Sequence, residues 1–285
     1  MAEPLIEYRD EIAGHATRVL EIEGDGPPIL LLHGFADSAD TWRMVLDRLS
    51  RTGRRAMAID LPGFGTCTTI RPDQEVLPQL DEMVAAAVRR LAEETGEQVV
   101  VAGNSLGGCA SLRAAQDREL PIVGAAPIAP AGFGFQPWFP LIERDPILRS
   151  LLATGLPIPH PITKAAIGQI YRTMAFADMT DVPPQVVSTF AEHIRDRRSI
   201  ARIMGIGRRL VSELREPFAL EHVTVPVLLV WGDRDRMVPH KGSRLLLEAL
   251  PHARYELIEG CGHCPQLETP DRVTETLLEF AAVPA

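Results

Sequence analysis

The sequence predicts an α/β protein, with a mostly parallel central sheet flanked by helices and an inserted, mainly helical segment. Continuously apolar runs of strand length alternate with helical patterns along most of the chain. This alternation is typical of a parallel sheet whose two faces are both covered by helices. The alternation stops at residue 131 and resumes after residue 221, which indicates an insertion into one α/β core.

In the first part of the chain, the earliest clear strand is the apolar run 27–34. The preceding segment, 15–26, alternates in polarity and ends in turn residues, which predicts a hairpin at the sheet edge. After the strand, Thr41 is placed to cap a helix over 42–49. A second strand, 54–60, then leads into the turn "LPGFG".

The next elements continue the same rhythm up to residue 130. A long helix is expected within 74–95 and is stopped by Gly96. A strand over 97–104, a helix from 106 to 117 and a strand within 122–130 follow in order.

Residues 131–221 carry many prolines and large apolar side chains but no convincing parallel strand. Helices are plausible within 162–174 and 184–214. The alternation resumes with four expected elements, which are a strand at 225–233, a helix at 240–250, a strand at 253–260 and a helix at 270–282. We therefore expect a core made of residues 1–130 and 222–285, with residues 131–221 forming a lid.

Composition excludes several classes of protein. Of the 285 residues, 46% are apolar and 24% charged, which is ordinary for a soluble globular protein with a sizeable core. The net charge of −9 argues against nucleic acid, whose phosphates require clustered Lys and Arg. No run approaches the roughly 18 apolar residues of a membrane span, and the start of the chain lacks the pattern of a secretory signal. We expect a cytoplasmic protein, while monomer and homodimer remain equally open.

The cysteine content predicts neither disulfides nor a metal site. Four cysteines in a chain of this length do not make a disulfide framework. Cys261 and Cys264 form a C-x-x-C pair around His263, but Cys67 and Cys109 lie far away in the sequence, and a structural zinc site needs four ligands. We expect no metal and no cofactor.

One short motif suggests chemistry. Gly103, Asn104, Ser105, Leu106 and Gly107 match G-x-S-x-G between an expected strand and an expected helix. This context fits a nucleophile elbow, in which a sharp turn lifts the serine hydroxyl to the carboxyl end of the sheet. The helix that follows would point its positive end toward a developing oxyanion. A simple helix-capping turn is the alternative.

A phosphate-binding loop is a further glycine-rich possibility for this stretch. It requires a Lys and then a Ser or Thr after the last glycine. Cys109 and Ala110 stand there instead, so this interpretation is disfavoured.

Five stretches in chain order resemble the α/β-hydrolase superfamily, namely "LLLHGF", "AIDLPGFG", "GNSLGG", "WGDRDRMVP" and "GCGHCPQLE". They span nearly the whole sequence, and the order Ser, Asp, His is that of the superfamily. The resemblance implies that Ser105 is the nucleophile and His263 the base. It favours Asp235 over Asp233 as the acid, because Pro239 follows Asp235 in the matching pattern; Asp233 is expected to make turn hydrogen bonds.

The resemblance also implies an oxyanion hole, formed by the backbone N–H groups of Phe35 and Leu106. The lid should supply apolar walls to the substrate pocket. Our candidates for that wall are Trp138, Phe139, Met174 and Phe176.

By this resemblance, the expected function is serine-dependent hydrolysis of small to medium, mostly apolar carboxylic esters through an acyl-enzyme. Related dehalogenases and epoxide hydrolases use an aspartate where Ser105 stands. One alternative is a carbon–carbon hydrolase acting on ring-fission products, although that branch usually has a Trp where Cys264 stands. Two further possibilities are cofactor-free haloperoxidase or perhydrolase activity and a non-enzymatic ligand receptor. The expected partner is a small-molecule ester.

Overall fold

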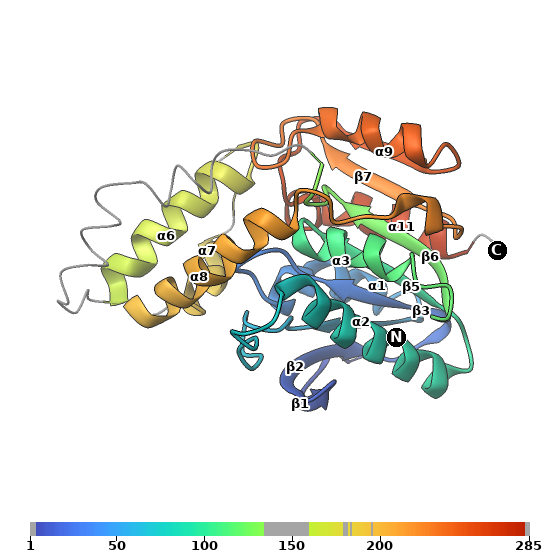
Figure 1. Cartoon of the computed structure of the whole chain (residues 1–285), viewed down its shortest axis with the longest axis horizontal. Helices are drawn as coiled ribbons and strands as arrows, with labels where there is room; N and C mark the ends of the chain where they lie inside the picture. The colour runs from blue at the N-terminus through green and yellow to red at the C-terminus, as the bar shows by residue number, and fades with distance from the viewer. Residues whose placement is uncertain (1–3, 134–159, 179–181, 183, 195, 283–285) are drawn as a thin grey trace.

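The predicted α/β fold is confirmed in a computed structural model that describes residues 4–282, except for 134–159, 179–181, 183 and 195 (Figure 1). The described residues form an eight-stranded sheet of order β1-β2-β4-β3-β5-β6-β7-β8. Its strands are β1 (Ile6–Ile12), β2 (His15–Ile22), β3 (Asp25–Leu32), β4 (Arg54–Ile59), β5 (Val99–Asn104), β6 (Ile122–Ile128), β7 (Leu228–Gly232) and β8 (Arg254–Ile258).

In the order across the sheet, the six strands β4, β3, β5, β6, β7 and β8 are parallel to one another, whereas β2 runs antiparallel to both of its neighbours, β1 and β4. The hairpin expected at the sheet edge is formed by β1 and β2. Strand β3 follows β2 in sequence but does not pair with it, because β4 lies between them. This crossover places β3 and β5 side by side near the middle of the sheet, so that the loops at their carboxyl ends meet.

Helices cover both faces of the sheet, and strand β3 shows why its sequence is continuously apolar. Leu30 and Leu32 pack into the layer that contains α2 (Val76–Thr95) and α3 (Leu106–Ala114). Ile29 and Leu31 pack into the opposite layer. Burying each such side chain contributes about 1.5–3 kcal/mol, so both layers stabilise the strand.

The opposite layer contains α1 (Arg43–Leu49) and α11 (Pro270–Ala281). The shorter elements of the core are η1 (Ala39–Trp42), η2 (Leu220–His222), η3 (His240–Gly242), α9 (Ser243–Ala249) and α10 (Pro265–Glu268). Helix α2 ends at the expected residue, because Gly96 adopts the left-handed conformation (φ 71°) that favours glycine.

The expected cap at Thr41 is absent. Thr41 lies inside η1, and α1 begins after Trp42 without a side-chain cap. The Thr41 hydroxyl instead accepts a hydrogen bond from Gln266 Nε2 at 3.1 Å. A long-range contact has therefore replaced the local one that the sequence suggested.

Among the described residues between β6 and β7, three α-helices extend from one end of the core (Figure 1). They are α6 (His160–Ala175), α7 (Pro184–Glu192) and α8 (Arg197–Glu213). The helical segment expected over 184–214 is divided in two, because Asp196 and Ser199 form a reciprocal capping box that starts α8. The described residues between β6 and β7 contain no strand.

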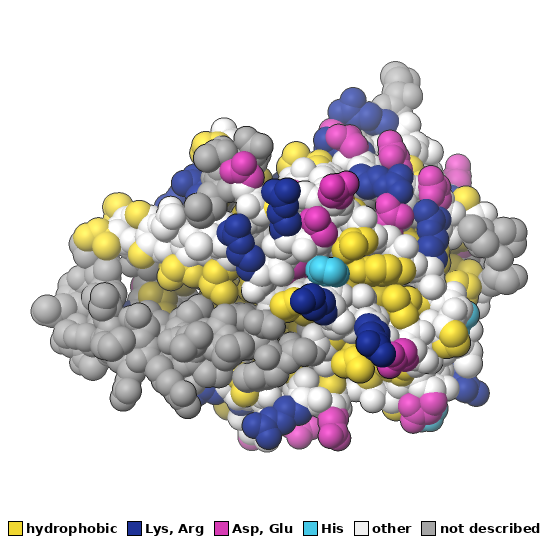
Figure 2. Space-filling model, turned by 90° about the horizontal axis from the view of Figure 1, so that it is seen from above, with side chains coloured by type: hydrophobic (Ala, Val, Ile, Leu, Met, Phe, Trp, Pro, Cys, Tyr) yellow, Lys and Arg dark blue, Asp and Glu magenta, His cyan; other side chains and the backbone are white. Residues whose placement is uncertain are grey.

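None of the helices described has the length and apolar character needed to cross a bilayer. On the face shown in Figure 2, acidic and basic side chains are interspersed and do not separate into broad patches of one sign.

Candidate active site

Ser105 occupies a strained turn between β5 and α3. Its backbone lies at φ 55° and ψ −111°, a region that non-glycine residues rarely adopt. A Cβ at Gly103 would lie 2.3 Å from the carbonyl of Gly107, and one at Gly107 would lie 2.2 Å from the Leu32 oxygen. Both glycines are thus required by the close approach of neighbouring backbone, as a nucleophile elbow demands.

Backbone hydrogen bonds hold this turn in place. The Ser105 N–H donates to the Ile128 carbonyl at 2.9 Å, and the Ser105 carbonyl accepts from the amides of Cys109 and Ala131 at the same distance. Leu106 is the first residue of α3, and the first amides of a helix have no acceptor within the helix. The Leu106 N–H therefore lies at the positive end of α3, next to the Ser105 side chain.

His263 and Asp235 form a buried pair. His263 Nδ1 lies 2.7 Å from Asp235 Oδ2, and the two side chains are 3% and 0% exposed. The other carboxylate oxygen of Asp235 accepts hydrogen bonds from the amides of Met237 and Val238, both at 2.8 Å. A carboxylate in this position assigns the ring proton to Nδ1 and leaves Nε2 with a lone pair.

His263 Nε2 is buried and has no hydrogen-bond partner among the described residues. His263 and Ser105 line the same cavity. A ring nitrogen with a free lone pair and a hydroxyl group therefore line the same cavity.

The structure distinguishes the two candidate carboxylates. Asp233 Oδ1 accepts a hydrogen bond from the Gly260 amide at 2.7 Å, which is a turn contact. Asp235 is the aspartate that contacts the ring of His263. The structure thus brings together Ser105, Asp235 and His263, from the ends of three strands.

The loop that carries His263 is held by side chains that our sequence analysis did not identify. Asn104 Nδ2 donates to the His263 carbonyl at 2.9 Å, which ties the elbow to this loop. Glu268 accepts hydrogen bonds from the amides of Gly262 and Ala177, both at 2.8 Å. The only sequence signal was the presence of polar residues inside the quoted stretches "GNSLGG" and "GCGHCPQLE".

The catalytic cavity, as we call the space above Ser105, has a volume of about 170 Å³. It is lined by Gly34, Phe35, Ala36, Asp37, Asn104, Ser105, Ile167, Ile170, Tyr171, Met174, Phe190, Ile194, Met237, His263 and Cys264. Most of these residues are apolar, and six of them come from the helices and loops of the insertion.

The four pocket candidates have different outcomes. Met174 lines the catalytic cavity. Phe176 does not, because its ring is buried against Tyr171 with centroids 5.3 Å apart, inside an apolar cluster that also contains Cys264 and Leu267. Trp138 and Phe139 lie outside the described residues.

The charges around the cavity are few. Its described lining contains no Lys or Arg, and the single carboxyl group in it belongs to Asp37. Cys264 lies in the wall, but burial raises the pKa of its thiol well above the usual range, so the thiol is not ionised near neutral pH. Among the residues described, no cluster of His, Cys, Asp and Glu is arranged to hold a metal ion.

His33 supports the loop that contains Phe35. Its Nδ1 lies 2.8 Å from the Gly34 carbonyl, while its Nε2 accepts a hydrogen bond from the Leu61 amide at 2.8 Å. Burial lowers the pKa of His33 to about 4. The ring is therefore neutral and bridges two loops at the carboxyl edge of the sheet.

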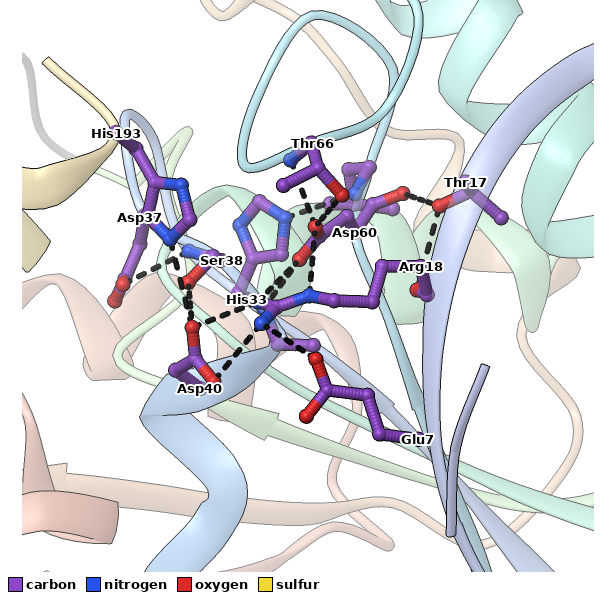
Figure 3. A network of polar contacts seen from close by, with 12 residues as sticks. Glu7, Thr17, Arg18, His33, Asp37, Ser38, Asp40, Asp60, Thr66 and His193 are labelled. Carbon is purple, nitrogen blue, oxygen red and sulfur yellow. Dashed lines mark hydrogen bonds and ion pairs between the residues drawn. The ribbon is translucent and has the colours of Figure 1, made fainter. Parts of the chain in front are cut away.

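A buried ionic network stabilises the same region (Figure 3). The Arg18 guanidinium contacts Asp40 at 2.7 Å and Asp60 at 3.2 Å. Burial acts to raise the pKa of Asp40, but its contacts with His193 and Arg18 outweigh that effect and hold the pKa well below its usual range. Asp60 also accepts a hydrogen bond from the Ala39 amide at 2.8 Å, which ties the loop after β4 to η1.

We expect Arg18→Met to lower the free energy of unfolding by about 3–5 kcal/mol at pH 7, because it leaves the fully buried Asp60 without its cation and removes one of the two guanidinium groups that pair with Asp40, the other being that of Arg43. The pKa of Asp40 is depressed in the folded state, so this stabilisation is present above the unfolded pKa of about 4 and is lost as pH falls below it. Urea unfolding at pH 7 and at lower pH measures both effects.

Arg51→Met is the matched control, since Arg51 pairs with Asp47 on the surface, where the side chains are 65% and 59% exposed. Its cost should stay below about 1 kcal/mol. Equal costs for the two variants at pH 7 would show that the buried network contributes no special stability.

Comparison with family models gives a match that covers most of the chain. The model of the alpha/beta hydrolase family matches residues 29–276. This range contains Ser105, Asp235 and His263.

Curated relatives include enzymes that act on esters. A pimeloyl-[acyl-carrier protein] methyl ester esterase from Xanthomonas campestris pv. campestris is 28% identical over 92% of this chain and 98% of its own length. A monoacylglycerol lipase from Mus musculus is 22% identical over 91% of this chain and 76% of its own length. The chain is thus similar to hydrolases of two kinds of ester.

Among solved structures, a 2-hydroxy-6-oxo-6-phenylhexa-2,4-dienoate hydrolase from Rhodococcus sp. strain RHA1 superposes with a TM-score of 0.75. The alignment covers 98% of this chain and 100% of the other, at 24% identity. At that identity the likeness concerns the fold.

Proposed function

The chain belongs to the alpha/beta hydrolase family, and on that premise we propose that it is a serine hydrolase of small to medium, mostly apolar carboxylic esters, acting through an acyl-enzyme. One observation carries the proposal. The contact between His263 Nδ1 and Asp235, at 2.7 Å, leaves His263 Nε2 without a described partner in the cavity that Ser105 lines.

In the acylation half of the reaction, Ser105 Oγ attacks the ester carbonyl carbon and His263 Nε2 takes the hydroxyl proton. Asp235 keeps the proton on Nδ1 and stabilises the imidazolium that forms. The tetrahedral intermediate then collapses and its bond to the alcohol oxygen breaks. The alcohol leaves with the proton from His263, and the acyl group remains on Ser105.

In the deacylation half, water gives a proton to His263 Nε2 and attacks the acyl carbon. Collapse of the second intermediate releases the carboxylic acid and returns the proton to Ser105. The N–H groups of Leu106 and Phe35 would stabilise the oxyanion in both halves. Losing one such donor typically costs about 3–4 kcal/mol of transition-state stabilisation.

The cavity walls support a substrate with an apolar portion. Ile167, Ile170 and Met174 of α6 face Ser105 across the catalytic cavity. Removing apolar surface from water contributes about 25 cal/mol per Å². In this proposal residues 131–221 act as a lid that closes the cavity and limits the length of the substrate.

The same lining argues against an anionic substrate. A free carboxylate would lose its hydration without a cation to compensate, and that loss is expensive. Arg172 and Arg202 of the insertion do not contribute to the described wall of the cavity, and Arg195 lies outside the described residues. Cys264 stands where carbon–carbon hydrolases usually have Trp. These features favour ester hydrolysis over carbon–carbon cleavage.

We expect neutral esters to be preferred over carboxylate-bearing esters of the same size by at least about tenfold in kcat/KM, which corresponds to about 1.4 kcal/mol. Among neutral esters, kcat/KM should rise over the first few acyl carbons and then fall when the chain no longer fits. Steady-state kinetics across such a series, with a ring-fission product included, test the proposed substrate class.

A clear preference for the charged esters, or for the ring-fission product, would contradict this substrate class. It would mean that a cation reaches the cavity, and the charge-neutral variants Arg172→Gln and Arg202→Gln would then identify it.

A further inference from the structure

A second cavity, which we call the side cavity, shares a wall with the catalytic cavity. It has a volume of about 260 Å³ and lies between α7, η1 and the start of α1. Asp37, Tyr171 and Phe190 line both spaces. The rings of Tyr171 and Phe190 are stacked, with centroids 3.8 Å apart and planes at 3°, so they form a thin partition beside the carboxyl group of Asp37.

Asp37 is a buried carboxyl group that the proposed reaction does not use. It follows β3 and is 6% exposed. One oxygen accepts a hydrogen bond from the Ser38 amide at 2.8 Å (Figure 3). Burial is the main influence that raises its pKa, to about 7, while Thr41 and His193 act in the opposite direction. Both protonation forms are therefore populated near neutral pH.

The two cavities differ in what they offer a ligand. The catalytic cavity presents aliphatic side chains above Ser105. The described wall of the side cavity includes polar side chains as well as apolar ones, among them Thr189, Gln185 and Arg43. A substrate that reached both would be apolar at one end and polar at the other, with Asp37 in the wall that the two cavities share.

We propose that Asp37 binds a hydroxyl group of the substrate, so that the preferred esters carry an uncharged, hydroxyl-bearing portion directed from the catalytic cavity toward the side cavity. This inference rests on the proposed function of Ser105. A hydroxyl can donate to a carboxylate or accept from a carboxylic acid, so it suits both forms of Asp37. An ammonium suits only the ionised form, and a substrate carboxylate would be repelled by it.

The test uses two matched pairs of esters. Propyl butanoate is compared with 2,3-dihydroxypropyl butanoate, and ethyl butanoate with ethyl 3-hydroxybutanoate, so that a hydroxyl is placed on either side of the ester. In the wild-type protein, the hydroxylated member of at least one pair should have a kcat/KM about tenfold higher, because a hydrogen bond to a buried carboxyl group discriminates by about that factor.

Asp37→Leu should bring this ratio to within about threefold of unity. Because the ratio compares two esters within one variant, any loss of turnover common to both esters cancels. Asp37→Ser should do the same if the leucine variant does not fold, because its side chain is shorter than that of aspartate and lacks the carboxyl group that the substrate hydroxyl would meet. Asp37→Asn keeps an amide oxygen at the same position and should retain the preference. Asp47→Asn removes a surface carboxyl group and is the matched control.

The outcomes separate the inference from the function on which it rests. Turnover of the plain esters, together with labelling of Ser105 by a phosphonate, reports on the proposed function alone. If both are intact but neither hydroxylated ester is preferred, or the preference survives in Asp37→Leu, the inference is wrong and the function stands. Faster turnover of 2-aminoethyl butanoate would assign Asp37 to an ammonium and also overturn it. No turnover of any ester would overturn both.

Discussion

Replacing Ser105 with alanine is expected to reduce ester turnover by at least about a thousandfold, because the loss of a nucleophile in such a triad removes most of the catalysis beyond binding and oxyanion stabilisation. The variant should also lose covalent labelling by an organophosphorus probe. Its fold should persist, since the substitution removes one oxygen atom and keeps the Cβ. Labelling followed by mass spectrometry, beside kinetics with a neutral ester, measures both effects.

Ser111→Ala is the matched control for this substitution. Ser111 is also buried in α3, where its hydroxyl donates to the Gly108 carbonyl at 2.8 Å. It should leave labelling and turnover nearly unchanged. A folded Ser105→Ala protein that is still labelled at another serine and still active would show that the nucleophile lies elsewhere.

Asp235→Asn is expected to cost about ten-thousandfold in kcat, because an amide at this position favours the wrong tautomer of His263 and cannot stabilise the imidazolium. The oxygen that accepts from the amides of Met237 and Val238 can be kept by the asparagine, so the turn should be preserved. The kcat of a purified, folded variant, compared with the wild type, measures this effect.

The neighbouring aspartate offers a direct comparison. Asp233 accepts one backbone hydrogen bond from Gly260, so Asp233→Asn should lower stability slightly and kcat by less than about tenfold. If Asp233→Asn abolished turnover while Asp235→Asn left it intact, in proteins of equal stability, the acid would be Asp233.

The order of the core elements was predictable because local patterns and burial agree there. Strand β3 is apolar at every position from Ile29 to Leu32, since both of its faces are covered. Gly96 marks the end of α2 because a left-handed residue is needed there. By contrast, the position of β4 between β2 and β3 depends on which strands pair across the sheet. The residues of one strand alone do not predict such pairing.

The part of the candidate site that could be predicted is the turn at Ser105, because its conformation depends on residues that are adjacent in the sequence. The glycines on either side of Ser105 are required by backbone atoms of adjacent segments, so the motif itself carries that information. The walls of the cavity were less predictable. Phe176 and Met174 are both large and apolar, yet Met174 of α6 lines the cavity, whereas Phe176 follows the end of that helix and packs against Tyr171.

The buried polar residues around the site illustrate the same limit. In the sequence, Asp37 lies in a stretch that predicts only a loop, and Asn104 lies in the G-x-S-x-G motif without a predicted role of its own. Their importance comes from burial and from partners far away in the sequence, such as the His263 carbonyl that Asn104 holds. Sequence spacing alone could not have revealed these contacts.

In the proposed mechanism, hydrolysis passes through an acyl group on Ser105. Rapid mixing with 4-nitrophenyl butanoate, followed by acid quenching and peptide mass spectrometry, detects that group directly. When deacylation is slower than acylation, we predict a burst of nitrophenol equal in amount to the active sites. We also predict a butanoyl group on the peptide that contains Ser105, and this group should form and disappear fast enough to account for turnover. Two results would contradict this mechanism. One is steady turnover by a protein in which quenching reveals no butanoyl on Ser105. The other is a butanoyl group on another residue, formed and lost fast enough to account for turnover.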